Sequence, residues 1–321
     1  MKPLRRLMLA AAAWLSAVGA FAGEGAGTSS GVFLTLPADA VTAALGGAAA
    51  AAQPAPSAVL GNPAGLAGVE NVGVEFSHAL WLEGISYDTL AAAVPAAGGT
   101  AALGLRYLSY GGIDALDNTG AAAGSVSPRD MAVSVAWAGE LGGGWAAGAG
   151  GKYVDSRIAA SASTFALDAG VRYLAGRLAA GVSVENVGGE LKFGREAYPL
   201  PRVFRLGGAY SAPSGLRLLA DGNISGAGSG WVSAGAEYPY VLNSAQLVLR
   251  CGYNTRYMAA GGLNGLSAGV GVKVRDFEFN YAFTAVGDLG VAHQFGIGLR
   301  WGGSAAGEKA EGSAMFMFSP I

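Results

Sequence analysis

Few residues of this chain are suited to chemistry. Its 321 residues include two histidines, His78 and His293, and one cysteine, Cys251. A serine or cysteine nucleophile needs a histidine base within hydrogen-bonding reach, and a transition-metal site needs clustered histidine, cysteine or carboxylate ligands. Both histidines lie instead near the ends of segments that alternate in polarity, on the mainly apolar side. The sequence therefore predicts no enzyme activity, no metal and no cofactor.

A second set of residues could act through charge. Near the C-terminus, charged side chains share the face opposite to the apolar one: Lys273, Arg275, Glu278 and Arg300. Inside a closed sheet, such a ladder of both signs would either line a water path or brace the wall, and the sequence leaves both interpretations open. At lipid depth an unpaired charge costs several kcal/mol. We therefore expect these charges to pair with one another or with a plug in the lumen.

The elements that position these charges are predicted to be strands. From Leu266 to Val274, from Phe277 to Phe283 and from Val291 to Trp301, every second residue is mainly apolar, and small, polar or charged residues lie between. Period two over about ten residues indicates antiparallel strands with one apolar face. A soluble sandwich shows the same alternation. Strand length, aromatic residues on one face and glycine, asparagine and basic residues on the other match a transmembrane barrel.

Composition agrees with an all-β membrane barrel. The mean hydropathy is +0.38 and only 13% of residues are charged, yet no interior run of eighteen apolar residues could form a spanning helix. The hydrophobicity is therefore spread along the chain, because only half of each barrel strand faces lipid. A net charge of −2 gives no basic surface for nucleic acid, which we exclude as a partner.

The first residues predict export. A basic start, a short apolar core over Leu7 to Val18 and the sequence Ala20-Phe21-Ala22 indicate a Sec signal peptide over residues 1–22. Export combined with a barrel pattern predicts the outer membrane of a Gram-negative-type cell, with its lipids as partners. A tail over residues 302–321 follows the barrel, and its role stays open between a periplasmic tail, a docking peptide and a remnant without structure.

Residues 23–70 do not alternate and are too few for a domain. Pro37 to Leu45 could form one short helix, because Asp39 can cap its start and Gly46 with Gly47 can end it. We expect this segment to plug the pore of a barrel formed by residues 71–301. Counting the alternating segments in that range predicts about fourteen strands.

Motifs at both ends resemble a known family. The chain is similar to PorV/PorQ-type outer-membrane proteins, a group that resembles the FadL fatty-acid transporter class. The resemblance implies a barrel of fourteen strands with the N-terminal segment in the lumen. It rests on residues 27–34, residues 43–48, the plug motif Asn62-Pro63-Ala64-Gly65 with Leu66 and Ala67, residues 76–78 with Trp81, and residues 287–301.

The last predicted strand carries one further pattern. Gln294, Gly296, Leu299 and Trp301 have the polar, glycine, apolar and aromatic spacing that resembles the signal read by barrel assembly machinery. That machinery is therefore an expected partner.

Two functions remain from the sequence. The resemblance favours a secretion-associated protein of type IX secretion, which binds and shuttles secreted cargo proteins at the cell surface. The alternative is a FadL-like channel for hydrophobic small molecules, in which Asn62-Pro63-Ala64 belongs to a hatch. A plugged lumen with a broad extracellular cup would favour the shuttle, and an apolar internal pocket would favour transport.

Overall fold

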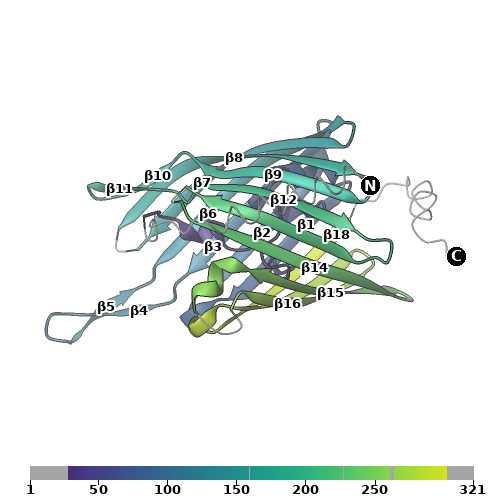
Figure 1. Cartoon of the computed structure of the whole chain (residues 1–321). Helices are drawn as coiled ribbons and strands as arrows, with labels where there is room; N and C mark the ends of the chain where they lie inside the picture. Colours follow the sequence, from purple (N-terminus) through teal and green to yellow (C-terminus); the bar gives the residue numbers. More distant parts are fainter. Residues whose placement is uncertain (1–27, 159, 227, 261–263, 302–321) are drawn as a thin grey trace.

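The computed structural model describes residues 28–158, 160–226, 228–260 and 264–301. Within them, fourteen antiparallel strands close into one barrel, in the order β1-β18-β17-β16-β15-β14-β13-β12-β9-β8-β7-β6-β3-β2 (Figure 1). The predicted fold class and strand number are confirmed. Among these residues no helix has the length and hydropathy needed to cross a bilayer. The predicted signal peptide and C-terminal tail lie outside the described residues.

The barrel strands run for nine to fifteen residues. Their bounds are β1 Val72–Leu80, β2 Ser86–Ala96, β3 Gly99–Ser109, β6 Arg129–Gly142, β7 Trp145–Arg157, β8 Ser161–Ala175, β9 Leu178–Val187, β12 Val203–Ser211, β13 Arg217–Ser225, β14 Gly230–Leu242, β15 Ala245–Asn254, β16 Leu266–Val274, β17 Phe277–Ala285 and β18 Val291–Trp301. Pairing of Val72 with Trp301 in the β1–β18 ladder closes the cylinder.

The two ends of the barrel differ. At one end the connections are tight, such as Ala97-Gly98 and Gly143-Gly144, and β1 starts and β18 finishes there; we call it the short-turn end. The other, the hairpin end, carries β4 (Ile113–Leu116) with β5 (Ala122–Val126), and β10 (Glu190–Phe193) with β11 (Glu196–Pro199). Figure 1 shows the β4–β5 hairpin extending well beyond the barrel.

The barrel is apolar outside. Large apolar side chains on the outer wall remain exposed, including Leu103 at 54%, Phe165 at 73% and Phe279 at 50%. Polar and charged side chains such as Arg106, Lys152 and Asp221 are buried on the inner wall. This arrangement is the reverse of a soluble protein and is typical of a barrel that contacts lipid.

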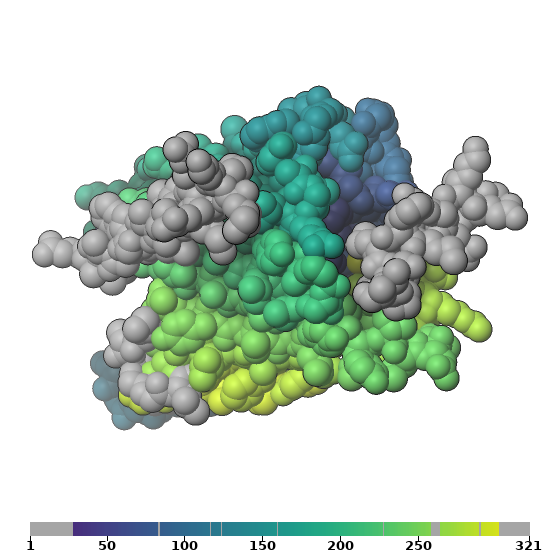
Figure 2. Space-filling view, turned by 45° about the vertical axis from the view of Figure 1, so that its right-hand side comes forward, coloured from purple at the N-terminus to yellow at the C-terminus, as the bar shows by residue number. Residues whose placement is uncertain are grey.

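The N-terminal segment lies inside the barrel (Figure 1, purple). It consists of short helices joined by irregular backbone: η1 (Val32–Thr35), α2 (Ala40–Ala44), η2 (Pro56–Leu60) and η3 (Pro63–Gly68). Helix α2 packs on β15 to β18, η2 on β1, β2, β3 and β6, and η3 on β3, β6, β7 and β8. Figure 2, which turns the short-turn end toward the viewer, shows purple residues of this segment recessed between the strands. We refer to residues 28–69 as the plug.

Short helices η4 (Leu82–Gly84), η5 (Thr255–Ala260) and η6 (Gly287–Leu289) lie in connections at the hairpin end. In η5, the guanidinium of Arg256 lies 4.9 Å from the centroid of the Trp231 ring and donates to Thr35 Oγ1 at 2.9 Å. This contact joins the β15–β16 connection to the plug.

Candidate functional site

The candidate site is the interface between the plug and the inner wall. Because most of the plug is not helical or strand-paired, its backbone N–H and C=O groups need other partners. Inward-facing side chains of the wall supply them. Thr89 donates to Ala38 O at 2.6 Å, and Arg106 donates to Leu36 O at 3.0 Å and also to Leu60 O. The plug is therefore held to β2 and β3 by polar side chains.

The tightest group of contacts involves the turn after α2. Asp221 on β13 accepts from Ala49 N at 2.6 Å and from Ala50 N at 2.8 Å. Arg205 on the neighbouring strand β12 donates to Gly47 O, and Arg217 at the start of β13 donates to Ala51 O, each at 2.9 Å. Asp221 is only 1% exposed. A buried carboxylate that accepts two backbone N–H groups forms charge-assisted bonds, which are stronger than neutral ones.

Helix α2 is fixed at both ends. Asp39 caps its start as predicted, accepting from Thr42 N at 2.7 Å. At its finish, Ser267 donates to Ala44 O at 3.0 Å and accepts from Gly46 N at 3.1 Å, while Asn254 donates to Gly46 O at 2.8 Å. Gly46 and Gly47 have φ of 67° and 86°, which agrees with their predicted role as a helix stop.

The predicted plug motif is buried against β6, β7 and β8. Asn62 caps η3 by accepting from Ala64 N at 3.1 Å, and its amide donates to Ala50 O at 2.8 Å. Pro63 occupies the first turn of η3, where no N–H partner is needed. Gly65 packs against Ala58, so a side chain there would crowd η2. The motif thus joins two separate parts of the plug.

Glycines in the wall allow this close approach. A Cβ at Gly170 on β8 would overlap the Asn62 side chain, and one at Gly181 on β9 would overlap the Ala50 carbonyl. The absence of side chains at these inward positions makes room for the plug backbone.

The luminal charges form a connected row around half of the wall. Arg217, Glu237 and Arg250 are direct cross-strand neighbours on β13, β14 and β15, and both arginines lie 3.1 Å from Glu237 carboxylate oxygens. Glu278 on β17 continues the row, 3.8 Å from Arg250. Like the predicted ladder, the row contains both signs, and Arg217, Glu237, Arg250 and Glu278 alternate, so each of these charges is compensated by its neighbours.

Three of the four predicted ladder residues belong to this row. Lys273 lies 3.2 Å and Arg300 lies 3.7 Å from Glu278, and Arg300 also reaches Glu75 at 4.0 Å. The predicted luminal position of Arg275 is wrong. This residue is exposed in the turn between β16 and β17, with a φ of 54°. The alternation that suggested a luminal position continues past the last residue of the strand, Val274.

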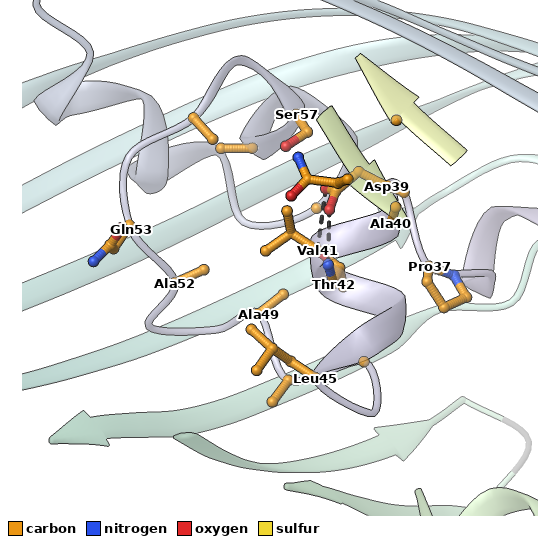
Figure 3. A pocket seen from close by; sticks show the side chains of 18 of the residues that line it. Pro37, Asp39, Ala40, Val41, Thr42, Leu45, Ala49, Ala52, Gln53 and Ser57 are labelled. Atoms are coloured by element: carbon orange, nitrogen blue, oxygen red, sulfur yellow. Dashed lines mark hydrogen bonds between the residues drawn. The ribbon is translucent and has the colours of Figure 1, made fainter. Parts of the chain in front are cut away.

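A cavity of about 310 Å³ separates the plug from the wall. Figure 3 shows Val41, Leu45, Ala49, Ala52 and Gln53 on the plug side of this space. The wall side is mainly polar and includes Glu75, Arg217, Glu237, Arg250, Lys273, Glu278 and Arg300. Within the described chain, the plug side of the cavity thus consists mainly of small uncharged residues with one carboxylate, Asp39, whereas the wall side carries charges of both signs.

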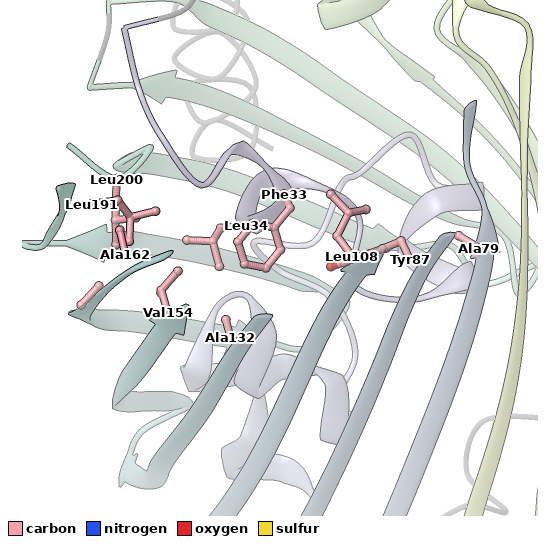
Figure 4. Close-up of a cluster of buried hydrophobic side chains, with 11 residues drawn as sticks. Phe33, Leu34, Ala79, Tyr87, Leu108, Ala132, Val154, Ala162, Leu191 and Leu200 are labelled. Carbon is pink, nitrogen blue, oxygen red and sulfur yellow. The ribbon is translucent and has the colours of Figure 1, made fainter. Parts of the chain in front are cut away.

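An apolar cluster fills the lumen near the hairpin end. Phe33 and Leu34 of η1 are each 3% exposed and pack among Tyr87, Leu108, Val154 and other wall residues. Figure 4 shows both side chains lying between the strand ends. The β10–β11 hairpin contributes Leu191, and Ser30 N donates to Pro199 O at 3.0 Å. The plug therefore occupies an apolar pocket with its own side chains.

The residues considered for catalysis lie on the outer wall. His78 Nδ1 lies 2.7 Å from Asp88 Oδ1, and His293 Nδ1 lies 2.8 Å from the Tyr281 hydroxyl. Cys251 is exposed and lies on another strand. No group of three metal-ligating side chains occurs in the described part of the chain.

The four residues of the possible assembly signal point to opposite sides of β18. Gln294 is buried and donates to Ser77 Oγ at 3.0 Å, and Gly296 faces Ala40 of the plug. Leu299 and Trp301 have the outward phase of the strand, and Trp301 is 45% exposed. Their part in assembly stays a prediction.

One polar network was not foreseen. In β9 a bulge places Glu185 and Asn186 on the inner wall together, with a φ of 60° at Asn186. Asn186 N donates to Asp168 at 2.8 Å, and Lys152 lies 2.8 Å from Asp168. The signal in the sequence that could have predicted this bulge is the pair of consecutive polar residues at 185 and 186, because it breaks the alternation of the strand.

Comparisons with known proteins identify the same architecture. No protein-family model and no curated protein matches the sequence. Among solved structures, the toluene transporter TbuX of Ralstonia pickettii is 13% identical with a TM-score of 0.54, covering 82% of this chain and 98% of that chain. A FadL homologue of Pseudomonas aeruginosa is 11% identical with a TM-score of 0.54, covering 83% and 99%.

The toluene transporter TodX of Pseudomonas putida is 12% identical, with a TM-score of 0.52 and coverage of 81% and 96%. At these identities the likeness establishes a shared fold. The chain therefore has the same barrel fold as these three proteins.

Proposed function

We propose that this protein is an outer-membrane channel for hydrophobic small molecules. The observation that carries the proposal is the apolar pocket near the hairpin end, which Phe33 and Leu34 fill. The FadL-type fold and the apolar outer wall support it. Short turns at one end and long connections at the other favour an orientation with the hairpin end outside the cell.

In this proposal the plug competes with the ligand. An apolar molecule entering between the β10–β11 hairpin and the strand ends takes the place of Phe33 and Leu34, whose burial contributes about 1.5–3 kcal/mol each. The ligand recovers part of that energy by burying its own surface. The charged row and the plug contacts lie deeper and limit the passage of water-soluble solutes while the plug is docked.

Uptake by intact cells tests the function. The protein is expressed in an outer-membrane-bearing strain without its own toluene uptake, and the initial rate of radiolabelled toluene uptake is measured. We expect a rate several-fold above that of cells with an empty vector, and a further increase for Phe33→Ala/Leu34→Ala. Val32→Ala is the matched control, because Val32 is 48% exposed and outside the apolar cluster. Equal uptake with and without the protein would refute the proposal.

The surface-shuttle function is a second candidate. The observation that favours it is the projecting β4–β5 hairpin, in which Ile113 is 54% and Val126 41% exposed, because such a surface could contact a secreted protein. Purification from native membranes followed by mass spectrometry separates the candidates. A stoichiometric secreted protein that is lost after replacement of residues 113–126 by a short Gly-Ser turn would support the shuttle, and recovery of lipid alone would count against it.

A further inference from the structure

The outer wall near the hairpin end carries two arginines side by side. Arg129 is the first residue of β6 and Arg157 the last of β7, and they are direct cross-strand partners. Both belong to the outward-facing residues of their strands, because the adjacent residues Asp130 and Ser156 are buried on the inner wall. The two guanidinium groups therefore extend from neighbouring positions on the outside of the barrel.

The described chain neutralises this pair only in part. Side chains of directly opposed residues start about 5 Å apart, and like charges in such positions destabilise the sheet. Neither Arg129 nor Arg157 forms an ion pair or hydrogen bond with another described residue. Asp155 lies on the same outer face as the two arginines, two residues before Arg157 on β7. Counting it leaves a net charge of +1, so the site favours an external anion.

Hydroxyl groups extend the site on both sides. In the same cross-strand row, Ser109 on β3 pairs with Arg129 and Ser161 on β8 pairs with Arg157. Both serines share the outward phase, since Leu108 and Ala162 beside them are buried. Arginine binds phosphate through two parallel N–H groups, and serine hydroxyls can donate to the remaining oxygens. The row thus has the donors that a phosphate monoester requires.

The row lies where lipid headgroups are expected. On β7 and β8, the outward aromatic pairs Trp145 with Tyr173 and Tyr153 with Phe165 have ring centroids 4.6 Å and 5.2 Å apart. Between Trp145 and Tyr153 the strand rises about 26 Å, or about 20 Å along the membrane normal at a tilt of about 40°. Arg157 lies about 30 Å above Trp145 by the same measure, beyond an apolar band of about 25 Å.

We propose that Arg129 and Arg157, with Ser109 and Ser161, bind the phosphate group of a phosphorylated lipid in the outer leaflet. The inference rests on the membrane orientation of the proposed function, but it requires no transport. It assigns a lipid-binding site to the strand ends at the base of the β4–β5 hairpin, opposite the apolar pocket across the wall. The bound phosphate neutralises the arginine pair and anchors the barrel to the leaflet.

Native mass spectrometry of the purified, detergent-solubilised full chain tests the site. The probe is lipid A with two phosphates, titrated against the wild type, Arg129→Gln/Arg157→Gln, and the matched control Arg195→Gln/Arg202→Gln. The control loses the same charge from exposed positions at the same end, outside the row. Loss of one charged hydrogen-bonding partner weakens binding roughly tenfold. We expect at least that loss in the first variant and less than twofold in the control.

Two further probes identify the recognised group. Dephosphorylated lipid A should bind the wild type at least tenfold more weakly, and inorganic phosphate at millimolar concentration should not displace lipid A. Equal binding of lipid A with and without phosphate, equal losses in both double variants, or displacement by inorganic phosphate would overturn the inference. Because binding is measured without cells, absent toluene uptake would refute the channel and leave this result unchanged.

Discussion

Replacing Asp221 with alanine should release the plug from the wall. The Asp221 carboxylate accepts both Ala49 N and Ala50 N, and one of its oxygens lies 3.7 Å from Arg205. In the variant, two backbone N–H groups lose their acceptor in a buried position. Arg205 retains its ion pair with Glu185 at 3.3 Å, so the main loss concerns the plug.

The expected magnitude follows from these two bonds. A hydrogen bond to a charged group contributes about 1.5–3 kcal/mol, so the gross loss is about 3–6 kcal/mol. Water from the adjacent cavity can reach the freed N–H groups and offsets part of it, which leaves about 3 kcal/mol. That value raises the population of an undocked plug roughly 100-fold. Asp221→Asn keeps one acceptor oxygen without the charge and should show a smaller increase of roughly tenfold.

Thiol labelling measures this population. In a Cys251→Ser background, a cysteine at position 51 is shielded while the plug is docked, because Ala51 is 1% exposed. Its rate of reaction with a hydrophilic maleimide then follows the fraction of undocked plug. Asp114→Ala, on the exposed β4–β5 hairpin, is the control and should not change the rate. A rate for Asp221→Ala within twofold of the parent, with the barrel intact, would refute the reasoning.

Other predictions concern the plug and the hairpin. Deletion of residues 23–68 should raise conductance in planar bilayers severalfold, and an unchanged conductance would argue against a plug. Gly181→Val should undock the plug in the same labelling assay, because its Cβ would overlap the Ala50 carbonyl. Asp117 accepts from the Thr119 hydroxyl and two backbone N–H groups, which lower its pKa. The turn it stabilises should therefore stay protected in amide exchange down to about pH 4 and lose protection as the pH falls through the lowered pKa; loss already at pH 6 would contradict this.

The barrel could be predicted from sequence because lipid outside and polar groups inside impose period two on every strand. Phe277 to Ala285 shows this, since its aromatic residues all face outward. The β4–β5 and β10–β11 hairpins lacked such a signal. The β4–β5 hairpin projects from the barrel end, where neither lipid nor a packed core selects one face of a strand, so a segment such as Ala122–Val126 has the composition of a loop. In the β10–β11 hairpin each strand has only four residues, too few for a period of two to be recognised, although Leu191 is buried.

The site was only partly predictable. The cap at Asp39 and the motif at Asn62 depend on local spacing, so the sequence contains the necessary information. The role of Asp221 depends on which wall position faces the turn after α2, at a separation of more than 170 residues. Arg275 shows the opposite error, because a local alternation was extended beyond the end of its strand.

The irregular plug and the polar wall require each other. A helical plug would satisfy its own backbone and could pack against an apolar lumen, but the described plug leaves carbonyls at Leu36, Gly46 and Ala51 that the wall must bond. Conversely, inward charges such as Arg205 and Asp221 would be costly without backbone partners or water. Contacts to the plug from β12 and β13 combine buried charges with backbone groups. On β16 to β18, by contrast, Lys273, Glu278 and Arg300 pair with one another. We therefore expect undocking to begin beside β16 to β18, where fewer plug groups lose partners, and to be limited by the contacts of Asp221.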